Sequence, residues 1–130
     1  MKKILVVEDD RNIVMSLGIR LEAAGYEVKQ AHDCASGFNI ALEFEPDLLL
    51  LDVLFPGGGG FGLASRLKDH PVLGGRPIIF LTASQQPGLC EDAKALGAVD
   101  FMCKPYEART LLASIDNALD DVEEEKGAFL

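Results

Sequence analysis

The stretch Leu48-Leu49-Leu50-Leu51-Asp52 decides the fold, because an unbroken apolar run ends there on a carboxylate. Its length and composition are typical of a strand buried on both faces, as in a parallel sheet covered by helices. Asp52 then lies at the carboxyl end of that strand. In open α/β sheets ligands bind outside this edge, so topology alone favours a chemical role for Asp52. The other interpretation of this residue, taken alone, is an Asp that begins a turn.

Strand-like and helix-like segments alternate along the whole chain. Besides 48–52, strands are predicted at 3–7, 26–31, 77–81 and 98–103. Helices are predicted at 11–24, from a cap at Asp33 to Phe44, at 61–69, before a stop at Gly97, and at 105–122, where Pro105 suits the first turn. The connections are too long for hairpins. The pattern therefore predicts one domain with a parallel α/β sheet and right-handed crossovers.

The first helix carries apolar residues on two sides. Its core stripe is predicted to consist of Ile13, Leu17, Leu21 and Ala24. Met15, Gly18 and Ile19 project opposite that stripe and are candidates for a partner surface. Scattered exposed apolar residues are common, and this remains the alternative.

Composition and charge exclude several classes of protein. Hydrophobic residues at 48% and charged residues at 25% are globular values, and no apolar stretch is long enough for a membrane span. No signal peptide precedes the first strand, which favours a cytoplasmic protein without membrane partners. The net charge of −9 argues against direct nucleic-acid binding. Three cysteines without C-x-x-C spacing support neither a disulfide framework nor zinc, and Cys34, Cys90 and Cys103 are predicted to be buried thiols.

Four successive glycines, at 57–60, follow Asp52 closely. Their backbone freedom predicts a mobile loop beside that carboxylate. A phosphate-binding P-loop is excluded, because Phe61 and Gly62 follow where Gly-Lys-Ser/Thr would be needed.

Four predicted strand ends present a coherent chemical set: Glu8 with Asp9, then Asp52, Thr82 and Lys104. Two carboxylates 4 Å apart repel by roughly 4 kcal/mol at an effective dielectric near 20, so converging acids call for a cation. Mg²⁺ prefers oxygen ligands and commonly bridges carboxylates to a phosphoryl group. A lysine ammonium and a threonine hydroxyl are groups that the remaining phosphoryl oxygens would use.

The chain closely resembles the receiver domain of two-component response regulators over residues 3–122. The runs that carry the resemblance, in order, are Ile4-Leu5-Val6-Val7-Glu8-Asp9, Leu51-Asp52, Pro56 through Gly60, Leu81-Thr82-Ala83, and Lys104-Pro105. The resemblance implies a flavodoxin-like, doubly wound, five-stranded parallel sheet of order 2-1-3-4-5, with helices on both faces.

The resemblance also implies a phosphorelay function. Asp52 would accept a phosphoryl group from the phosphohistidine of a sensor histidine kinase or phosphotransfer protein. Thr82 and Lys104 would hold that group, and Phe101 would be the aromatic that turns inward on activation. Mg²⁺ would be held by Glu8, Asp9, Asp52 and the main-chain carbonyl of Leu54.

Such a domain is not a turnover enzyme, although it promotes its own aspartyl phosphorylation and dephosphorylation. It switches conformation to control a downstream effector protein or output domain, and a homodimer formed on phosphorylation is left open. Residues 1–122 would be the receiver domain, and residues 123–130 an acidic C-terminal tail or the start of a linker. The chain would be either a stand-alone receiver or the front of a longer regulator.

Two other classes of protein share parts of this pattern. A flavodoxin-like flavin protein should have a Ser/Thr-rich phosphate loop after the first strand, where this chain has Glu8-Asp9-Asp10. A receiver-like domain used only for binding usually lacks one or more site residues, and this chain retains them all.

Overall fold

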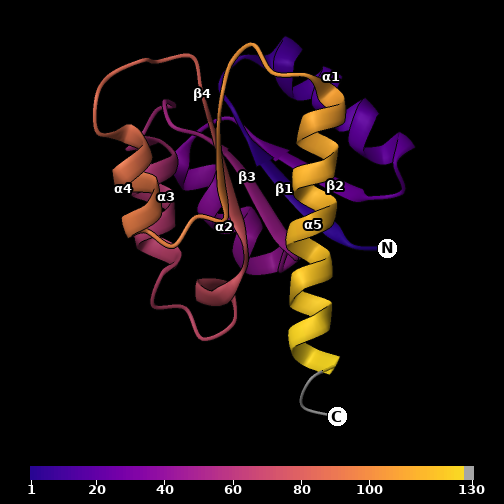
Figure 1. The fold of residues 1–130 in the computed structure, drawn as a ribbon. Coiled ribbons are helices and arrows are strands. Elements are labelled where there is room, and N and C mark those ends of the chain that lie inside the picture. Colours follow the sequence, from indigo (N-terminus) through magenta and orange to yellow (C-terminus); the bar gives the residue numbers. More distant parts are fainter. Residues whose placement is uncertain (128–130) are drawn as a thin grey trace.

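The structure is a computed structural model that describes residues 1–127, with side chains described through residue 120. In this part of the chain five parallel strands form one sheet of order β2-β1-β3-β4-β5 (Figure 1). The strands are β1 (Lys3–Val7), β2 (Glu27–Ala31), β3 (Leu48–Asp52), β4 (Ile78–Thr82) and β5 (Asp100–Cys103). The helices are α1 (Arg11–Ala23), α2 (Cys34–Phe44), α3 (Gly59–Leu67), the short 3₁₀ helix η1 (Leu73–Gly75), α4 (Leu89–Ala95) and α5 (Ala108–Gly127). The predicted fold class and strand order are confirmed.

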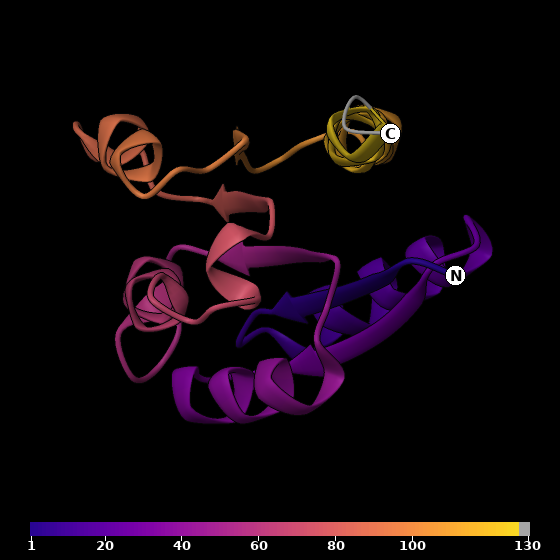
Figure 2. The same ribbon diagram turned by 90° about the horizontal axis from the view of Figure 1, so that it is seen from below.

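Strand β3 lies at the centre of the sheet, and all five of its residues are buried. Its side chains alternate between two core clusters, as the twofold repeat of a strand requires. Leu49 and Leu51 join the cluster under α2, α3 and α4, whereas Leu48 and Leu50 join the cluster under α1 and α5. Figure 2 shows α5 on the opposite side of the sheet from α2 and α3. Burial of each leucine contributes about 1.5–3 kcal/mol, which makes this strand the main anchor of the fold.

Side-chain caps fix the starts of two helices. Asp10 Oδ1 accepts hydrogen bonds from the backbone N–H groups of Asn12 (3.0 Å) and Ile13 (3.3 Å). Asp33 Oδ1 accepts one from the N–H of Ser36 at 2.7 Å, so the predicted cap of α2 is confirmed. Each cap satisfies N–H groups that have no partner within the helix.

The predicted faces of α1 need two corrections. Met15 and Ile19 are 60% and 64% exposed, as expected for the outer side. Gly18 is buried instead, because the Gln30 side chain lies over it: a Cβ at residue 18 would come within 2.5 Å of Gln30 Nε2. Ala24, predicted to be in the core stripe, is exposed beyond the end of the helix.

The prediction of a loop through Gly60 is wrong, since α3 begins at Gly59. A Cβ at Gly59 would lie 2.0 Å from the Val53 carbonyl oxygen, and φ there is +68°. A Cβ at Gly60 would lie 2.3 Å from the Asp52 carbonyl oxygen. Glycine is needed at both residues because the backbone of α3 approaches the end of β3 so closely.

The cysteines and the last helix also differ from the prediction. Cys34 is buried, but Cys90 and Cys103 are exposed, because α4 lies on the outside and Cys103 ends the edge strand β5.

Helix α5 begins at Ala108, so Pro105 precedes it by three residues. Tyr106 turns in to pack on the core cluster under α1 and α5. The helix runs to Gly127, five residues past the predicted end, and its last turns extend beyond the sheet (Figure 1). Side chains beyond residue 120 are not described, and residues 128–130 lie outside the described residues altogether.

Helix α5 is also tied to the sheet by polar contacts. The Tyr26 hydroxyl donates to Asp116 Oδ1, and the Ser114 hydroxyl donates to Asp100 Oδ2 at 2.5 Å. Among the described residues, none of the helices is both long and apolar enough to cross a membrane.

Candidate functional site

The register of the sheet brings the predicted site residues to one edge. Asp52 is the Cα partner of Leu81, and the next residue of β4, Thr82, is the partner of Cys103. Lys104 follows at once, and its N–H donates to the Thr82 carbonyl at 2.7 Å. Three neighbouring strands therefore end together, and their last side chains can act on one ligand.

Lys104 is the centre of the charged cluster. Its Nζ donates to Asp52 Oδ2 at 2.6 Å and to Glu8 Oε2 at 2.8 Å. The side chains are only 16%, 8% and 5% exposed for Lys104, Asp52 and Glu8, so water screens these contacts weakly. Hydrogen bonds between charged groups are about twice as strong as neutral ones, and this lysine holds two carboxylates that would otherwise repel each other.

The second oxygen of Asp52 is held by the loop that follows β3. The Leu54 N–H donates to Asp52 Oδ1 at 2.8 Å, while the Leu54 side chain is 64% exposed. Both oxygens of Asp52 thus have a donor, one from Lys104 and one from the backbone. The carboxylate is held in a single orientation at the end of the strand.

The two buried acids, Glu8 and Asp52, have pKa values shifted in opposite directions. Burial, and then the neighbouring Asp52, raise the pKa of Glu8 to about 7, although Lys104 works to lower it. Burial also works to raise the pKa of Asp52, but hydrogen bonds with Glu8, Lys104 and the Leu54 N–H outweigh it and lower that pKa overall. The pKa of Lys104 is raised, because its two carboxylate partners outweigh the effect of burial. As pH falls, Glu8 therefore binds a proton before Asp52 does, and Asp52 stays anionic.

Thr82 is completely buried beside this cluster. Its Oγ1 accepts a hydrogen bond from the N–H of Ser84 at 3.0 Å, which leaves the hydroxyl proton able to point to another acceptor. Phe101 lies two residues before the end of β5 and is partly buried against the core cluster under α2, α3 and α4.

The three acids predicted to hold Mg²⁺, which are Glu8, Asp9 and Asp52, are not gathered around one point. Asp9 is exposed, and Asp10 is used as the cap of α1. Among the described residues, no group of three or more His, Cys, Asp or Glu side chains is arranged to hold a metal ion. The ammonium of Lys104 supplies the positive charge between Glu8 and Asp52 in this arrangement.

Sequence reasoning missed three residues next to the site. His32 Nδ1 lies 3.0 Å from the Glu8 carbonyl oxygen and donates to it when that nitrogen carries the proton. The Cys34 N–H donates to the Pro56 carbonyl at 2.8 Å and so fixes the loop after β3. Tyr106, which is partly buried, has its pKa raised by burial, although the charge of Lys104 works to lower it. The available signal for His32 was its place just after β2, beside β1 at the same edge.

Fold and site together define a class: a doubly wound α/β domain with a buried, lysine-paired aspartate at the carboxyl edge of its sheet. Comparison with known families agrees, since residues 4–116 match the model of the response regulator receiver domain. The chain belongs to this family, whose members are signalling domains of two-component systems rather than turnover enzymes.

Individual relatives show the same likeness over most of the chain. The phosphate regulon transcriptional regulatory protein PhoB of Pseudomonas aeruginosa is 36% identical over 118 residues, which are 91% of this chain and 52% of that protein. Response regulator PleD of Caulobacter vibrioides is 36% identical over 113 residues, 87% of this chain and 25% of that protein. The chain thus spans about half of one curated relative and a quarter of the other.

Solved structures match over nearly their full length. A CheY-like response regulator receiver domain protein from Methanospirillum hungatei superposes with a TM-score of 0.90 at 30% identity, covering 96% of this chain and 98% of that one. The chemotaxis response regulator CheY4 of Vibrio cholerae gives a TM-score of 0.84 at 30% identity, covering 91% and 98%.

Proposed function

We propose that Asp52 accepts a phosphoryl group from the phosphohistidine of a sensor histidine kinase or phosphotransfer protein. A carboxylate oxygen of Asp52 forms a bond to phosphorus as the phosphorus–nitrogen bond breaks, and the electron pair returns to the imidazole. The observation that supports this role best is the pair formed by Asp52 and Lys104, in which a lowered pKa keeps the acceptor anionic. No proton has to leave Asp52 before it attacks.

Lys104 and Thr82 would hold the transferred group. The Lys104 ammonium already bonds Asp52 Oδ2, so a phosphoryl group on this residue brings its oxygens within reach of the same donor. The buried Thr82 hydroxyl ends the neighbouring strand and can donate to another phosphoryl oxygen. Domains of this kind promote their own phosphorylation and dephosphorylation without turning over a separate substrate, and we extend that to this chain.

The donor set fits Mg²⁺, the ion that receiver domains generally use. Carboxylate and carbonyl oxygens are the ligands that this hard cation prefers. The pKa of Glu8 is raised by burial and then by the neighbouring Asp52, and a divalent cation would favour the ionised form of both acids. Glu8, Asp9, Asp52 and the main-chain carbonyl of Leu54 would hold the ion. When bound, it neutralises charge on the phosphoryl oxygens.

The phosphoryl group would then be read as a change in packing. It adds up to about two negative charges and several strong acceptors beside Thr82. A Thr82 side chain drawn toward those acceptors vacates space that Phe101, partly buried nearby on β5, can fill. The face formed by α4, β5 and α5 would thereby change shape.

That face would pass the signal to a downstream effector protein or output domain. PhoB is named as a transcriptional regulatory protein, and the chain spans about half its length. We therefore propose residues 1–122 as the receiver domain and residues 123–130 as a tail or the start of a linker. A homodimer formed on phosphorylation, the absence of direct nucleic-acid binding and a cytoplasmic location stay predictions from the sequence.

Intact-mass spectrometry after incubation with acetyl phosphate and Mg²⁺ tests the proposal. A gain of one phosphoryl group is expected, and no gain when EDTA is present from the start of the incubation. An unchanged mass under these conditions would identify a receiver-like domain used only for binding.

A further inference from the structure

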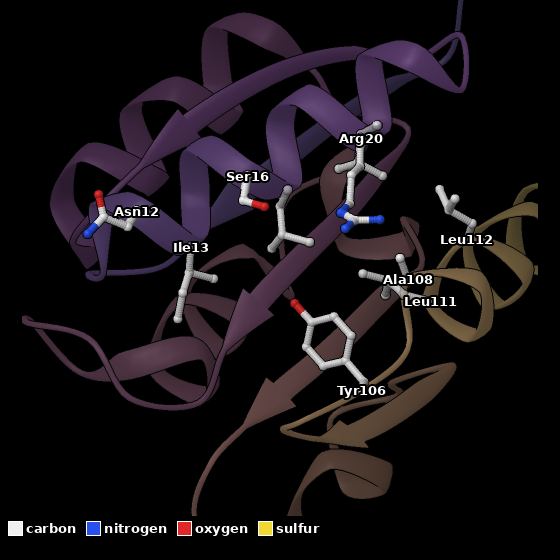
Figure 3. Close-up of a pocket in the computed structure, with 10 residues that line it drawn as sticks. Asn12, Ile13, Ser16, Arg20, Tyr106, Ala108, Leu111 and Leu112 are labelled. Atoms are coloured by element: carbon white, nitrogen blue, oxygen red, sulfur yellow. The ribbon is translucent and has the colours of Figure 1, made fainter.

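A groove of about 320 Å³ lies between α1 and α5, on the face of the sheet away from α2 and α3. Side chains from α1 line one wall, and Tyr106 with the first turns of α5 lines the other. Figure 3 shows Arg20 and Tyr106 reaching into the space between these walls from opposite sides. None of the residues placed in the phosphoryl site lines this groove.

The floor of the groove is apolar and buried. Leu17, Leu21 and Leu111 form it, and all three are buried members of the α1/α5 cluster. Ile13 and Leu112 are partly buried along its sides. An apolar cavity of about 150 Å³ is known to hold benzene. The groove therefore has room for an aromatic ring together with a short side chain.

The rim provides a specific polar group. Arg20 carries the one charge of the lining, and no carboxylate lines the groove. Neither the Arg20 guanidinium nor the Tyr106 hydroxyl makes a hydrogen bond or an ion pair with the residues that the structure describes. A guanidinium presents donors in the geometry that a carboxylate accepts, and a phenol hydroxyl can add one more.

We propose that this groove binds a small monocarboxylate whose body is an aromatic ring or an aliphatic group of similar size. The apolar body lies on the leucine floor, and the carboxylate meets Arg20 and the Tyr106 hydroxyl. The net charge of the chain is −9, so the long-range field repels an anion and recognition has to come from this local contact. A dicarboxylate or a phosphate ester would gain less, because the groove has a single charged partner.

Amide NMR with 3-phenylpropionate as the probe tests the proposal, with 3-phenylpropanamide as the uncharged match. A ligand of this size is expected to bind with a dissociation constant of about 1–10 mM. The largest shifts should fall on residues 12–21 and 106–112. Because Arg20 is exposed, the amide should bind only about three- to fivefold more weakly than the acid.

Three variants separate the effect of the charge from the effect of the groove. Arg20→Gln should weaken the acid about three- to fivefold and leave the amide unchanged, which removes the preference between them. Arg109→Gln changes the same charge on an exposed residue of α5 outside the lining and should preserve the preference. Ser16→Phe fills the groove from an exposed residue of α1 and should abolish binding of both probes, with unchanged circular dichroism.

Three results would overturn the proposal. The first is an absence of saturable shifts up to 20 times the highest expected dissociation constant, that is, about 200 mM probe at constant ionic strength. The second is equal binding of the acid and the amide to the unmodified chain. The third is a set of shifts centred outside α1 and α5, or binding that survives Ser16→Phe.

Discussion

Lys104 Nζ lies 2.6 Å from Asp52 Oδ2, although the two residues are 52 positions apart and β4 runs between their strands. Both side chains are largely shielded from water. Burial alone would raise the pKa of Asp52, and the contact with Lys104 is one of the hydrogen bonds that lower it instead. The same pair thus keeps the acceptor anionic and provides a cation for the group that it would accept.

Variants of Lys104 and Thr82 should separate phosphoryl uptake from the response to it. Lys104→Ala is expected to impair both, because it removes the cation that contacts the acceptor. Thr82→Ala should still take up phosphoryl but respond weakly, since it lacks the hydroxyl that the added oxygens attract. Amide NMR with beryllofluoride as the phosphoryl mimic measures the response across residues 84–112. Changes confined to the surroundings of Asp52 in the unmodified chain, with Phe101 unaffected, would exclude the proposed switch.

Asp9 and Asp10 should differ sharply in their effect on Mg²⁺. Asp9→Ala is expected to abolish metal binding, because Asp9 belongs to the proposed ligand set. Asp10→Ala should keep the metal and lower the free energy of unfolding by about 1 kcal/mol, since it removes the cap that accepts from Asn12 and Ile13. Calorimetric titration and urea unfolding measure the two effects. Equal losses of Mg²⁺ affinity would mean that the acid pair is wrongly assigned.

Two glycines of α3, Gly60 and Gly62, provide matched variants that test how closely this helix approaches the segment after Asp52. Gly60→Ala places a Cβ 2.3 Å from the Asp52 carbonyl oxygen and should cost about 1–3 kcal/mol while slowing phosphoryl uptake. Gly62→Ala meets nothing within 4 Å and should stabilise the helix by about 0.5–1 kcal/mol with unchanged uptake. Urea unfolding and the rate of mass gain test both. Similar behaviour of the two variants would rule out close backbone approach as the reason for glycine at residue 60.

Alkaline pH should weaken the contact between Tyr26 and Asp116. Burial, and then the Asp116 carboxylate, raise the pKa of Tyr26 above its ordinary value of 10.0. The folded state therefore favours the protonated phenol. Its contribution to stability is complete below about pH 10 and is lost as pH rises beyond it, because the unfolded chain then ionises first.

Urea unfolding between pH 8 and pH 11 measures this effect. The free energy of unfolding should fall less steeply in Tyr26→Phe than in the unmodified chain. Tyr106→Phe measures the share of the second tyrosine, whose pKa is also raised by burial. An identical slope in Tyr26→Phe and the unmodified chain would show that Tyr26 does not contribute.

Local sequence patterns were sufficient to predict the strands and the edge of the sheet on which the site lies. The apolar runs ending on Glu8, Asp52 and Thr82 are buried in the structure as their composition requires. Because parallel strands end at one edge, alternation of strands and helices also brought Lys104 to these residues. The contact between Lys104 and the two carboxylates follows from topology plus opposite charge.

Features that depend on contacts between distant elements could not be predicted in this way. Burial of Gly18 depends on Gln30 from β2, and exposure of Cys103 depends on β5 lying at the edge of the sheet. Glycine at residues 59 and 60 reflects the approach of α3 to carbonyl groups of the preceding segment, and composition alone suggests only flexibility. The hydrogen bond between His32 and the Glu8 carbonyl likewise depends on the pairing of β2 with β1, which only the predicted strand order indicates.

Asp52 is the phosphoryl acceptor in the proposed function, and locating the modified residue tests this role most directly. Borohydride reduces an acyl phosphate to an alcohol, so the acceptor aspartate becomes homoserine and can be found by peptide mass spectrometry. After treatment with acetyl phosphate and Mg²⁺, homoserine is expected at residue 52 alone, and Asp52→Asn should give none while Asp69→Asn behaves as the unmodified chain. Homoserine at any other aspartate of the unmodified chain, or phosphoryl uptake by Asp52→Asn at the normal rate, would contradict the account.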